Sequence, residues 1–586
     1  MDGEAVSSQT PNSHKERDMS ERRHLHARLR FVLVVAVLAV TLPASLAGAQ
    51  GPGAGPGPGA GPGPGGGTNL STFVTADFSG SGNCAACHSN LRDGAGNDVS
   101  MDTHWRSTMM ANAAKDPLWQ AKIQSEVLRN PALQSVIEDK CTRCHMPMAR
   151  TQAVADGTPV GVLGSGFLDP AHPLNAAARD GVSCSLCHQV RNEGLGGPAT
   201  FTGGYVIDTS TSAPNRLIYA KFANPMQAPM RNAVGYTPVQ GPQTTDSGFC
   251  GVCHVLYTPM VDAQGNVLGE FPEQMTYLEW ENSGYGDGVG TDQSCQDCHL
   301  PLASGPVKIS NRPMRLPARS PFHQHHYVGG NALLIQMLKG HQADLGVTAS
   351  GAQLDATLGR IAGQLSSNTA SLQVTGSQVA NGTLTLSLAV QNRSGHKLPS
   401  GIPTRRVWLH VTVKDAAGTT FFESGRPLAD GSIEGDDQDA GTGSFEPHYD
   451  LISQADQVQI YETVMRNSDG QLTYTLLRAA AYAKDNRLLP AGLNKATAHP
   501  DIATWGRAAT DGNFVGGSDA VTYAIDVQGR RLPLTVSAEL LYQATSRAFV
   551  SDLSQDSGDL VQRFAGYYDR ADKSPMLVSS VQVTVR

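Results

Sequence analysis

The pattern Cys-x-x-Cys-His occurs five times in the first half of the sequence and uses all ten of its cysteines. Two thiols at this spacing can add to the two vinyl groups on one edge of a porphyrin. The histidine that follows then lies beneath the ring, where it can ligate the iron. Zinc knuckles and redox Cys-x-x-Cys pairs are disfavoured, because neither requires a histidine after every cysteine pair. The motifs therefore predict five covalently bound c-type haems.

Each motif supplies two cysteines for thioether bonds and one proximal iron ligand. The cysteines are Cys84, Cys87, Cys141, Cys144, Cys184, Cys187, Cys250, Cys253, Cys295 and Cys298. The proximal histidines are His88, His145, His188, His254 and His299. Because no cysteine remains, we expect no disulfide and no cysteine nucleophile.

The sixth coordination position of each iron needs a further ligand, from histidine or methionine, or stays open. The chain has 18 histidines, of which five lie in the motifs and three lie in the N-terminal leader, so ten remain. Since at most five are needed, every iron can be six-coordinate, which favours electron transfer over chemistry at iron. The candidate distal ligands are His104, Met110, His172, His325 and His396.

Local sequence distinguishes these candidates. His104 and Met110 fall in a stretch with helix-forming character, at 102–115. Six residues of helix rotate by about 600°, so the two side chains point apart and would serve different irons. Both are therefore retained as separate candidates.

The other three candidates are chosen by their position along the chain. His172 lies shortly before the third motif, and His325 belongs to a histidine cluster that closely follows the fifth. His396 lies in a turn, within the sequence SGHKLP. From that turn it would reach back to cap a haem, and so would dock the second half of the chain onto the first.

Two regions of contrasting pattern must position these residues. Residues 68–345 contain short helical pieces rich in Gly and Pro, as expected where cofactors fill the interior, and 346–370 forms a connection with an expected helix at 352–364. From 371 to 586, apolar and polar residues alternate with period two. The expected fold is an α-helical, loop-rich multihaem cytochrome c domain followed by an all-β, sandwich-like domain. The clearest alternating segments are 383–390, 406–413 and 579–585.

The N-terminus predicts export. A basic segment precedes an apolar stretch at 31–42 and the small-residue sequence AGA, so we expect a signal peptide at 1–49, with the true start possible at Met19. About twelve apolar residues are too few to span a bilayer, which argues against a retained anchor. Residues 50–67 are almost entirely Gly, Pro and Ala and predict a flexible linker. The expected location is the periplasm or the cell surface.

The formal net charge of −8 is mild for 586 residues and argues against a nucleic-acid partner. We expect redox proteins as partners. The flexible N-terminus and the surplus of histidines are also compatible with peripheral membrane or cell-surface association and with an oligomer or a haem-lined filament. The acidic sequence DDQD at 436–439 is interpreted as a solvated loop, with calcium binding as the alternative.

Several stretches resemble multihaem cytochromes c of the cytochrome c-552/c-554-like group. They are WRSTMMANA at 105–113, DGVSCSLCH at 180–188, FCGVCHVLYT at 249–258, FPEQMTYLEW at 271–280 and SCQDCH at 294–299. In the second half, GHKLP at 395–399, RRVWL at 405–409 and KDNRLLP at 484–490 resemble the β-domain that accompanies some of these cytochromes. The resemblance implies electron transfer in the periplasm or at the cell surface.

The resemblance also bears on Met110. Related proteins often carry Trp-x-x-Ser/Thr-x-His-Ala with the histidine as a distal ligand. Here Trp105, Thr108 and Ala111 match, and Met110 replaces the histidine. This departure implies one His/Met haem of higher potential than its bis-histidine neighbours.

The runner-up hypothesis is a multihaem oxidoreductase in which one open-site haem acts on a small nitrogen or sulfur compound. Ammonia-forming nitrite reductases usually carry one Cys-x-x-Cys-Lys site, which this sequence lacks. The leading hypothesis is therefore an exported pentahaem cytochrome that passes electrons along its haems between respiratory or extracellular redox partners.

Overall fold

The computed structural model describes residues 69–586 except 287, 289–291 and 442. The predicted signal peptide and linker lie outside the described residues. Among the residues that are described, no helix is long and apolar enough to cross a membrane.

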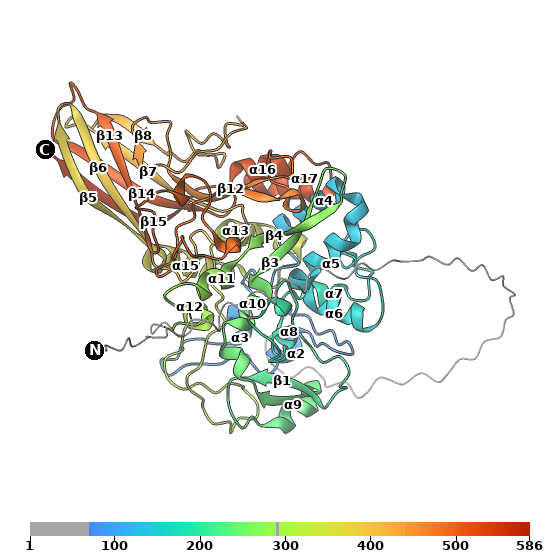
Figure 1. Cartoon of the computed structure of the whole chain (residues 1–586). Coiled ribbons are helices and arrows are strands. Elements are labelled where there is room, and N and C mark those ends of the chain that lie inside the picture. Colours follow the sequence, from blue (N-terminus) through green and yellow to red (C-terminus); the bar gives the residue numbers. More distant parts are fainter. Residues whose placement is uncertain (1–68, 287, 289–291, 442) are drawn as a thin grey trace, which may run out of the picture. The chain divides into compact units, whose positions relative to one another are not determined.

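Short helices carry the five motifs (Figure 1). The first motif begins on α2 (Ser81–Ala85), and the second ends α5 (Gln134–His145). The others lie on α8 (Cys184–Cys187), α10 (Gly248–His254) and α12 (Cys295–His299). Each helix places its histidine at or just beyond its last turn. The remaining helices of this region are α3 (Met101–Trp105), α4 (Pro117–Arg129), α6 (Pro147–Ala155), α7 (Asn175–Arg179), α9 (Gln227–Val234) and α11 (Thr276–Glu281).

Two small sheets interrupt the expected helical region. Strand β1 (Arg216–Ala220) pairs in parallel with β2 (Tyr236–Gln240), and β3 (Leu256–Val261) pairs antiparallel with β4 (Val267–Gln274). Strand β3 begins two residues after His254, and β4 ends two residues before α11. The β3–β4 hairpin therefore connects the fourth motif directly to α11.

The helix expected at 102–115 is much shorter in the structure, where α3 ends at Trp105. Side chains bind the carbonyls that a continuing helix would use. The Thr108 hydroxyl donates to the Trp105 carbonyl at 2.7 Å, and the Asn112 amide donates to the Arg106 and Thr108 carbonyls at 3.0 and 2.8 Å. Such local hydrogen bonds compete with helix propagation. The rotation expected between His104 and Met110 therefore does not apply.

Three α-helices lie between the last motif and residue 370: α13 (Ala332–Gly340), α14 (Gln342–Leu345) and α15 (Gly351–Gln364). The last agrees closely with the helix expected at 352–364. It begins with a capping box, in which the Ser350 hydroxyl accepts from the Gln353 N–H and the Gln353 side chain accepts from the Ser350 N–H.

Two sheets form the framework of the chain beyond residue 370. One has the order β5-β6-β13-β9, and the other has the order β11-β10-β7-β14-β15, with β12 beside β10 and β8 beside β7. The inward residues of β6, such as Leu384 and Leu388, and those of β7, such as Leu409 and Val411, are fully buried in one shared core. The strands are β5 (Ala370–Ala380), β6 (Thr383–Asn392), β7 (Arg406–Lys414), β8 (Thr420–Ser424), β9 (Leu451–Ile452), β10 (Ile460–Arg466), β11 (Leu472–Thr473), β12 (Ala481–Asp485), β13 (Ser518–Asp526), β14 (Leu534–Gln543) and β15 (Met576–Val585).

The region expected to be all-β contains two helices between β14 and β15. They are α16 (Arg547–Leu553) and α17 (Asp559–Arg570). Arg129 on α4 forms ion pairs of 2.7 and 2.9 Å with Asp552 and Asp556. These helices pack against α4, so they join the second half of the chain to the first.

The acidic sequence at 436–439 is not the solvated loop that we expected. The Asp436 and Asp439 carboxylates are buried, and each lies 2.7 Å from the Arg406 guanidinium. The Arg406 guanidinium already pairs with both carboxylates and occupies the place that a cation would take, so they do not form a calcium site either.

Candidate cofactor-binding site

The thiols of different motifs approach one another. Cys84 lies within hydrogen-bonding distance of Cys184, Cys144 of Cys253, and Cys250 of Cys295. Cys187 also lies close enough to Cys250 and Cys253 for its charge to raise the pKa of both thiols. In space, the order is therefore first, third and fourth motif, with the second and the fifth both beside the fourth.

Four of the five motif histidines share one hydrogen-bonding arrangement. In each, ring Nδ1 lies within hydrogen-bonding distance of a backbone carbonyl oxygen. Because a carbonyl only accepts, Nδ1 must carry the proton, and Nε2 keeps its lone pair for a metal. The distances are 2.7 Å from His88 to Ile309, 3.1 Å from His145 to Ala113, 2.6 Å from His188 to Tyr219 and 2.7 Å from His299 to Val328.

His254 in the fourth motif differs from the other four. Its side chain is solvent-accessible, yet protein atoms surround it closely enough to lower its pKa to about 4, helped by the charges of His299, Arg405 and His396. Within the described residues, the structure gives this ring no hydrogen bond and no ring contact with another histidine. Its neutral imidazole therefore borders an accessible space inside a protein-lined site.

His396 lies opposite His299. Their ring centroids are 6.4 Å apart and their planes differ by 20°. Two imidazoles that bind one metal ion at about 2.0–2.1 Å each would place their centroids roughly 6.3 Å apart. Nδ1 of His396 donates to the Lys397 carbonyl at 3.0 Å, so its Nε2 also keeps a lone pair. The pair has the separation and the tautomers that an iron between the rings requires.

His325 has the same relation to His188. The centroids are 6.5 Å apart and the planes differ by 37°. Nδ1 of His325 is buried without a partner, and burial lowers its pKa to about 3, with further contributions from nearby histidines. A neutral, buried imidazole with an unsatisfied nitrogen is suited to a metal ion that the polypeptide does not itself provide.

The other three distal candidates have different surroundings. His104 is buried with an unpartnered Nδ1, and its ring meets the ring of His326 edge-on at 4.5 Å, which is too close for an iron between them. His172 packs on Phe167 at 5.1 Å, and its Nδ1 accepts from the Leu174 N–H. For Met110, the structure gives only backbone hydrogen bonds, in which its carbonyl accepts from Ala113 and Val182.

Other residues at the site were not selected from the sequence. His323 donates from Nδ1 to the Leu300 carbonyl at 2.9 Å, which is the arrangement of the motif histidines. Trp119 stacks on His145 with centroids 4.7 Å apart and planes 7° apart. The local sequence signal for His323 was its place in the cluster that contains His325, but nothing in the sequence linked Trp119 to the second motif.

Glu273 is a buried carboxyl close to the second motif. Its Oε2 has no partner, and burial, together with the charge of Glu126, raises its pKa to about 8, although Lys122 and Lys140 act in the opposite direction. Burial raises the pKa of the Cys141 thiol, and the charge of Glu273 adds to this effect. A carboxyl that is neutral at pH 7 holds its proton and can release it when positive charge develops beside it.

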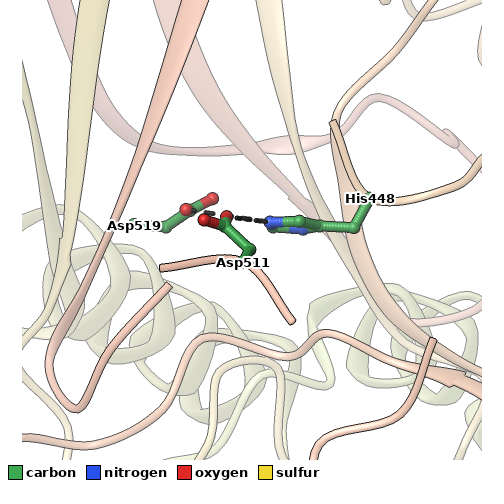
Figure 2. A group of neighbouring side chains, drawn as sticks. All are labelled: His448, Asp511 and Asp519. Carbon is green, nitrogen blue, oxygen red and sulfur yellow. Dashed lines mark hydrogen bonds and ion pairs between the residues drawn. The ribbon is translucent and has the colours of Figure 1, made fainter. Parts of the chain in front are cut away.

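A separate polar cluster in the β-region contains His448, Asp511 and Asp519, all buried (Figure 2). The orientations of two amides determine the tautomer of the histidine. Gln459 accepts the Tyr449 N–H with its oxygen and presents Nε2 to His448 Nδ1 at 2.8 Å. Asn486, oriented in the same way by its own backbone contacts, presents Nδ2 to the same atom at 3.1 Å.

Because Nδ1 accepts two hydrogen bonds, the ring proton of His448 is on Nε2. Nε2–H donates to Asp511 at 3.0 Å, and Asp519 lies 3.8 Å away. Burial and the two donors disfavour a second proton, in agreement with a pKa lowered to about 4. A metal ion at these carboxylates would face the N–H rather than a lone pair. The cluster is therefore a structural hydrogen-bond network and does not fit a cation.

No family model matches the sequence, and no curated protein matches it. Among solved structures, the chain is similar to the crystal structure of a penta-heme cytochrome c552 from Thermochromatium tepidum, with a TM-score of 0.48 and 18% sequence identity. The match covers 86% of this chain and 98% of that chain. A similarity this low assigns neither fold nor function, so the assignments below depend on this chain's own residues.

Proposed function

We propose that this chain is an exported c-type cytochrome that binds five haems covalently and passes electrons between redox partners. The observation that carries the proposal is the tautomer that four of the motif histidines share, with the proton on Nδ1. Four donate from Nδ1 to a backbone carbonyl. Two of these, His188 and His299, face a second imidazole at the centroid distance expected for two ligands of one metal ion.

The roles of the residues follow from this arrangement. The ten motif cysteines hold the porphyrins by thioether bonds, and the motif histidines ligate the irons from the proximal side. His325 and His396 are the distal ligands for the third and fifth motifs. The haems supply one-electron redox chemistry, and imidazoles on both faces keep small molecules away from the iron.

The order of the motifs in space gives the electron path a branch. Electrons would move between the first, third and fourth haems and leave through either the second or the fifth. Cys298 is the exposed cysteine among the ten, so the fifth haem is the one best placed to meet a partner protein. The expected partners are periplasmic or cell-surface redox proteins.

A second candidate function is favoured by His254. Its neutral ring borders an accessible space, and Arg405 is close enough for its charge to act on it. If this space admits a small nitrogen or sulfur compound to the iron, the fourth haem would act as an oxidoreductase site. The fourth haem, which lies where the electron path branches, would then be the site to which electrons are delivered.

Electron paramagnetic resonance of the oxidised protein, followed by addition of nitrite and, after reduction, carbon monoxide, separates the two functions. A cytochrome that only transfers electrons gives five low-spin haems and no change with either ligand. An oxidoreductase gives one high-spin haem that responds to both. A protein that contains no haem would contradict both proposals.

A further inference from the structure

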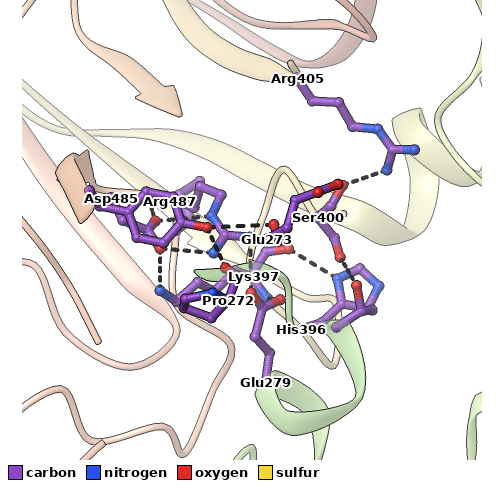
Figure 3. Close-up of polar contacts among 12 residues, drawn as sticks. Pro272, Glu273, Glu279, His396, Lys397, Ser400, Arg405, Asp485 and Arg487 are labelled. Carbon is purple, nitrogen blue, oxygen red and sulfur yellow. Dashed lines mark hydrogen bonds and ion pairs between the residues drawn. The ribbon is translucent and has the colours of Figure 1, made fainter. Parts of the chain in front are cut away.

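Four charged residues form a buried cluster directly beside His396 (Figure 3). The Lys397 ammonium and the Arg487 guanidinium lie 2.7 and 2.8 Å from the same oxygen of Asp485. Arg487 also lies 2.9 Å from Glu279. The four side chains are between 0 and 7% exposed, and their charges balance.

Such a cluster is costly to bury, because each charge loses its hydration. Burial opposes ionisation of Asp485, but Arg487 and Lys397 together lower its pKa to about 2, so the carboxylate stays charged at neutral pH. Apolar residues of equal volume would often give the same stability. What a fully paired ionic cluster provides in addition is a defined geometry.

Every polar group of Lys397 has a hydrogen-bond partner, and two of these partners belong to the cluster. Its N–H donates to Glu279 at 3.1 Å, and its ammonium donates to Asp485 and to the Ala503 carbonyl. Its carbonyl accepts the Nδ1–H of His396 at 3.0 Å. The residue that orients the His396 ring is therefore itself held by Glu279 and Asp485.

The cluster also joins three segments that are distant in sequence. Glu279 is on α11, in the region of the motifs, whereas Lys397 lies in the turn before β7, and Asp485 ends β12. On the other side of His396, the Asn392 amide donates to the His396 carbonyl at 2.9 Å. The turn is thus held on both sides of His396, facing the fifth motif.

We propose that Glu279, Lys397, Asp485 and Arg487 are positioning residues that hold His396 as the sixth ligand of the haem at 295–299. This inference rests on the proposed function, because it assumes that His299 and His396 share an iron. It makes the spin state of one haem depend on charges contributed by the β-region.

Asp485→Asn tests this inference, and Asp436→Asn is the matched control. Both aspartates are buried and pair with cations, but Asp436 pairs with Arg406 and does not contact the turn that carries His396. The purified holoproteins are compared by electron paramagnetic resonance and by redox titration. Glu279→Gln is the second variant if Asp485→Asn does not fold.

In Asp485→Asn, the ratio of six- to five-coordinate iron at one haem should fall on the order of tenfold. A high-spin signal should appear, integrating to no more than one haem per protein, and added imidazole should remove it. His396→Ala should give the same signal in full, and Asp436→Asn should give none. Wild-type spectra and potentials in folded Asp485→Asn would overturn the inference. Wild-type protein with no haem at this motif would instead overturn the proposed function.

Discussion

Replacement of Asp519 by asparagine tests whether the His448 cluster is a network of neutral and charged side chains without a metal ion. Asp519 is 1% exposed, and its carboxyl accepts the Tyr461 hydroxyl at 2.7 Å. Burial, and to a lesser extent the charges of Asp511 and Asp450, raises its pKa from 3.8 to about 7. Between these two values, the folded protein holds a proton that the unfolded chain releases.

The sign of the effect follows from linkage. Since the folded state binds the additional proton, the free energy of unfolding falls as the pH rises from about 4 to about 7 and is constant above that range. A difference of about three pKa units corresponds to about 4 kcal/mol. Asp519→Asn cannot ionise, so it should lack this component of the pH dependence. The free energy of unfolding of Asp519→Asn, measured relative to that of wild type, should therefore be higher at pH 8 than at pH 4.5.

The assay is urea unfolding at pH 4.5, 6 and 8, followed by circular dichroism, for wild type, Asp519→Asn and Asp526→Asn. Asp526 lies on the same strand, β13, but is exposed, so its variant should follow wild type. Equal pH dependence in wild type and Asp519→Asn would refute the reasoning. So would stabilisation of wild type, but not of Asp519→Asn, by zinc, manganese or calcium, because a bound cation requires a lone pair on His448 Nε2.

Three further predictions concern haem attachment, redox potential and the β-core. Replacing Cys295 and Cys298 by alanine should lower the mass of the denatured protein by one haem and leave the other four, as measured by mass spectrometry. Glu273→Gln should flatten the pH dependence of one midpoint potential between pH 5 and 9. In wild type, this carboxyl ionises with a pKa of about 8, and its negative charge favours oxidised iron, so the midpoint potential falls as the pH rises. The same slope in Glu273→Gln as in wild type would contradict this reasoning. Leu388→Ala, at a fully buried position on β6, should lower the free energy of unfolding by about 2–5 kcal/mol, whereas Leu451→Ala, at a 54% exposed position, should change it by less than about 0.5 kcal/mol.

The local elements could be predicted where one periodicity dominates. Alternation at 383–390 and 406–413 corresponds to β6 and β7, and the helix expected at 352–364 is α15. Helices α16 and α17 were missed because the surrounding strand pattern was extended across them. The helical spacing of Val561, Phe564 and Tyr568, all buried on α17, was a signal that could have identified that helix.

The candidate site, too, could be predicted from the sequence only in part. The motif residues are adjacent in sequence, so their chemistry can be read without a structure. The relation of His396 to His299 is set by contacts across almost a hundred residues, and the sequence supplied only its place in a turn. Asp436 and Asp439 look solvated in sequence because their partner, Arg406, is contributed by a distant segment, strand β7. Side chains paired across the fold leave no local pattern.

The intact mass of the denatured, purified protein tests the central claim most directly, because thioether-bound haem remains attached after unfolding. We predict the mass of the polypeptide plus five haems, with each haem carried on a peptide that contains one of the five motifs. A mass equal to that of the polypeptide alone, or motif peptides with free or disulfide-bonded cysteines, would contradict the account.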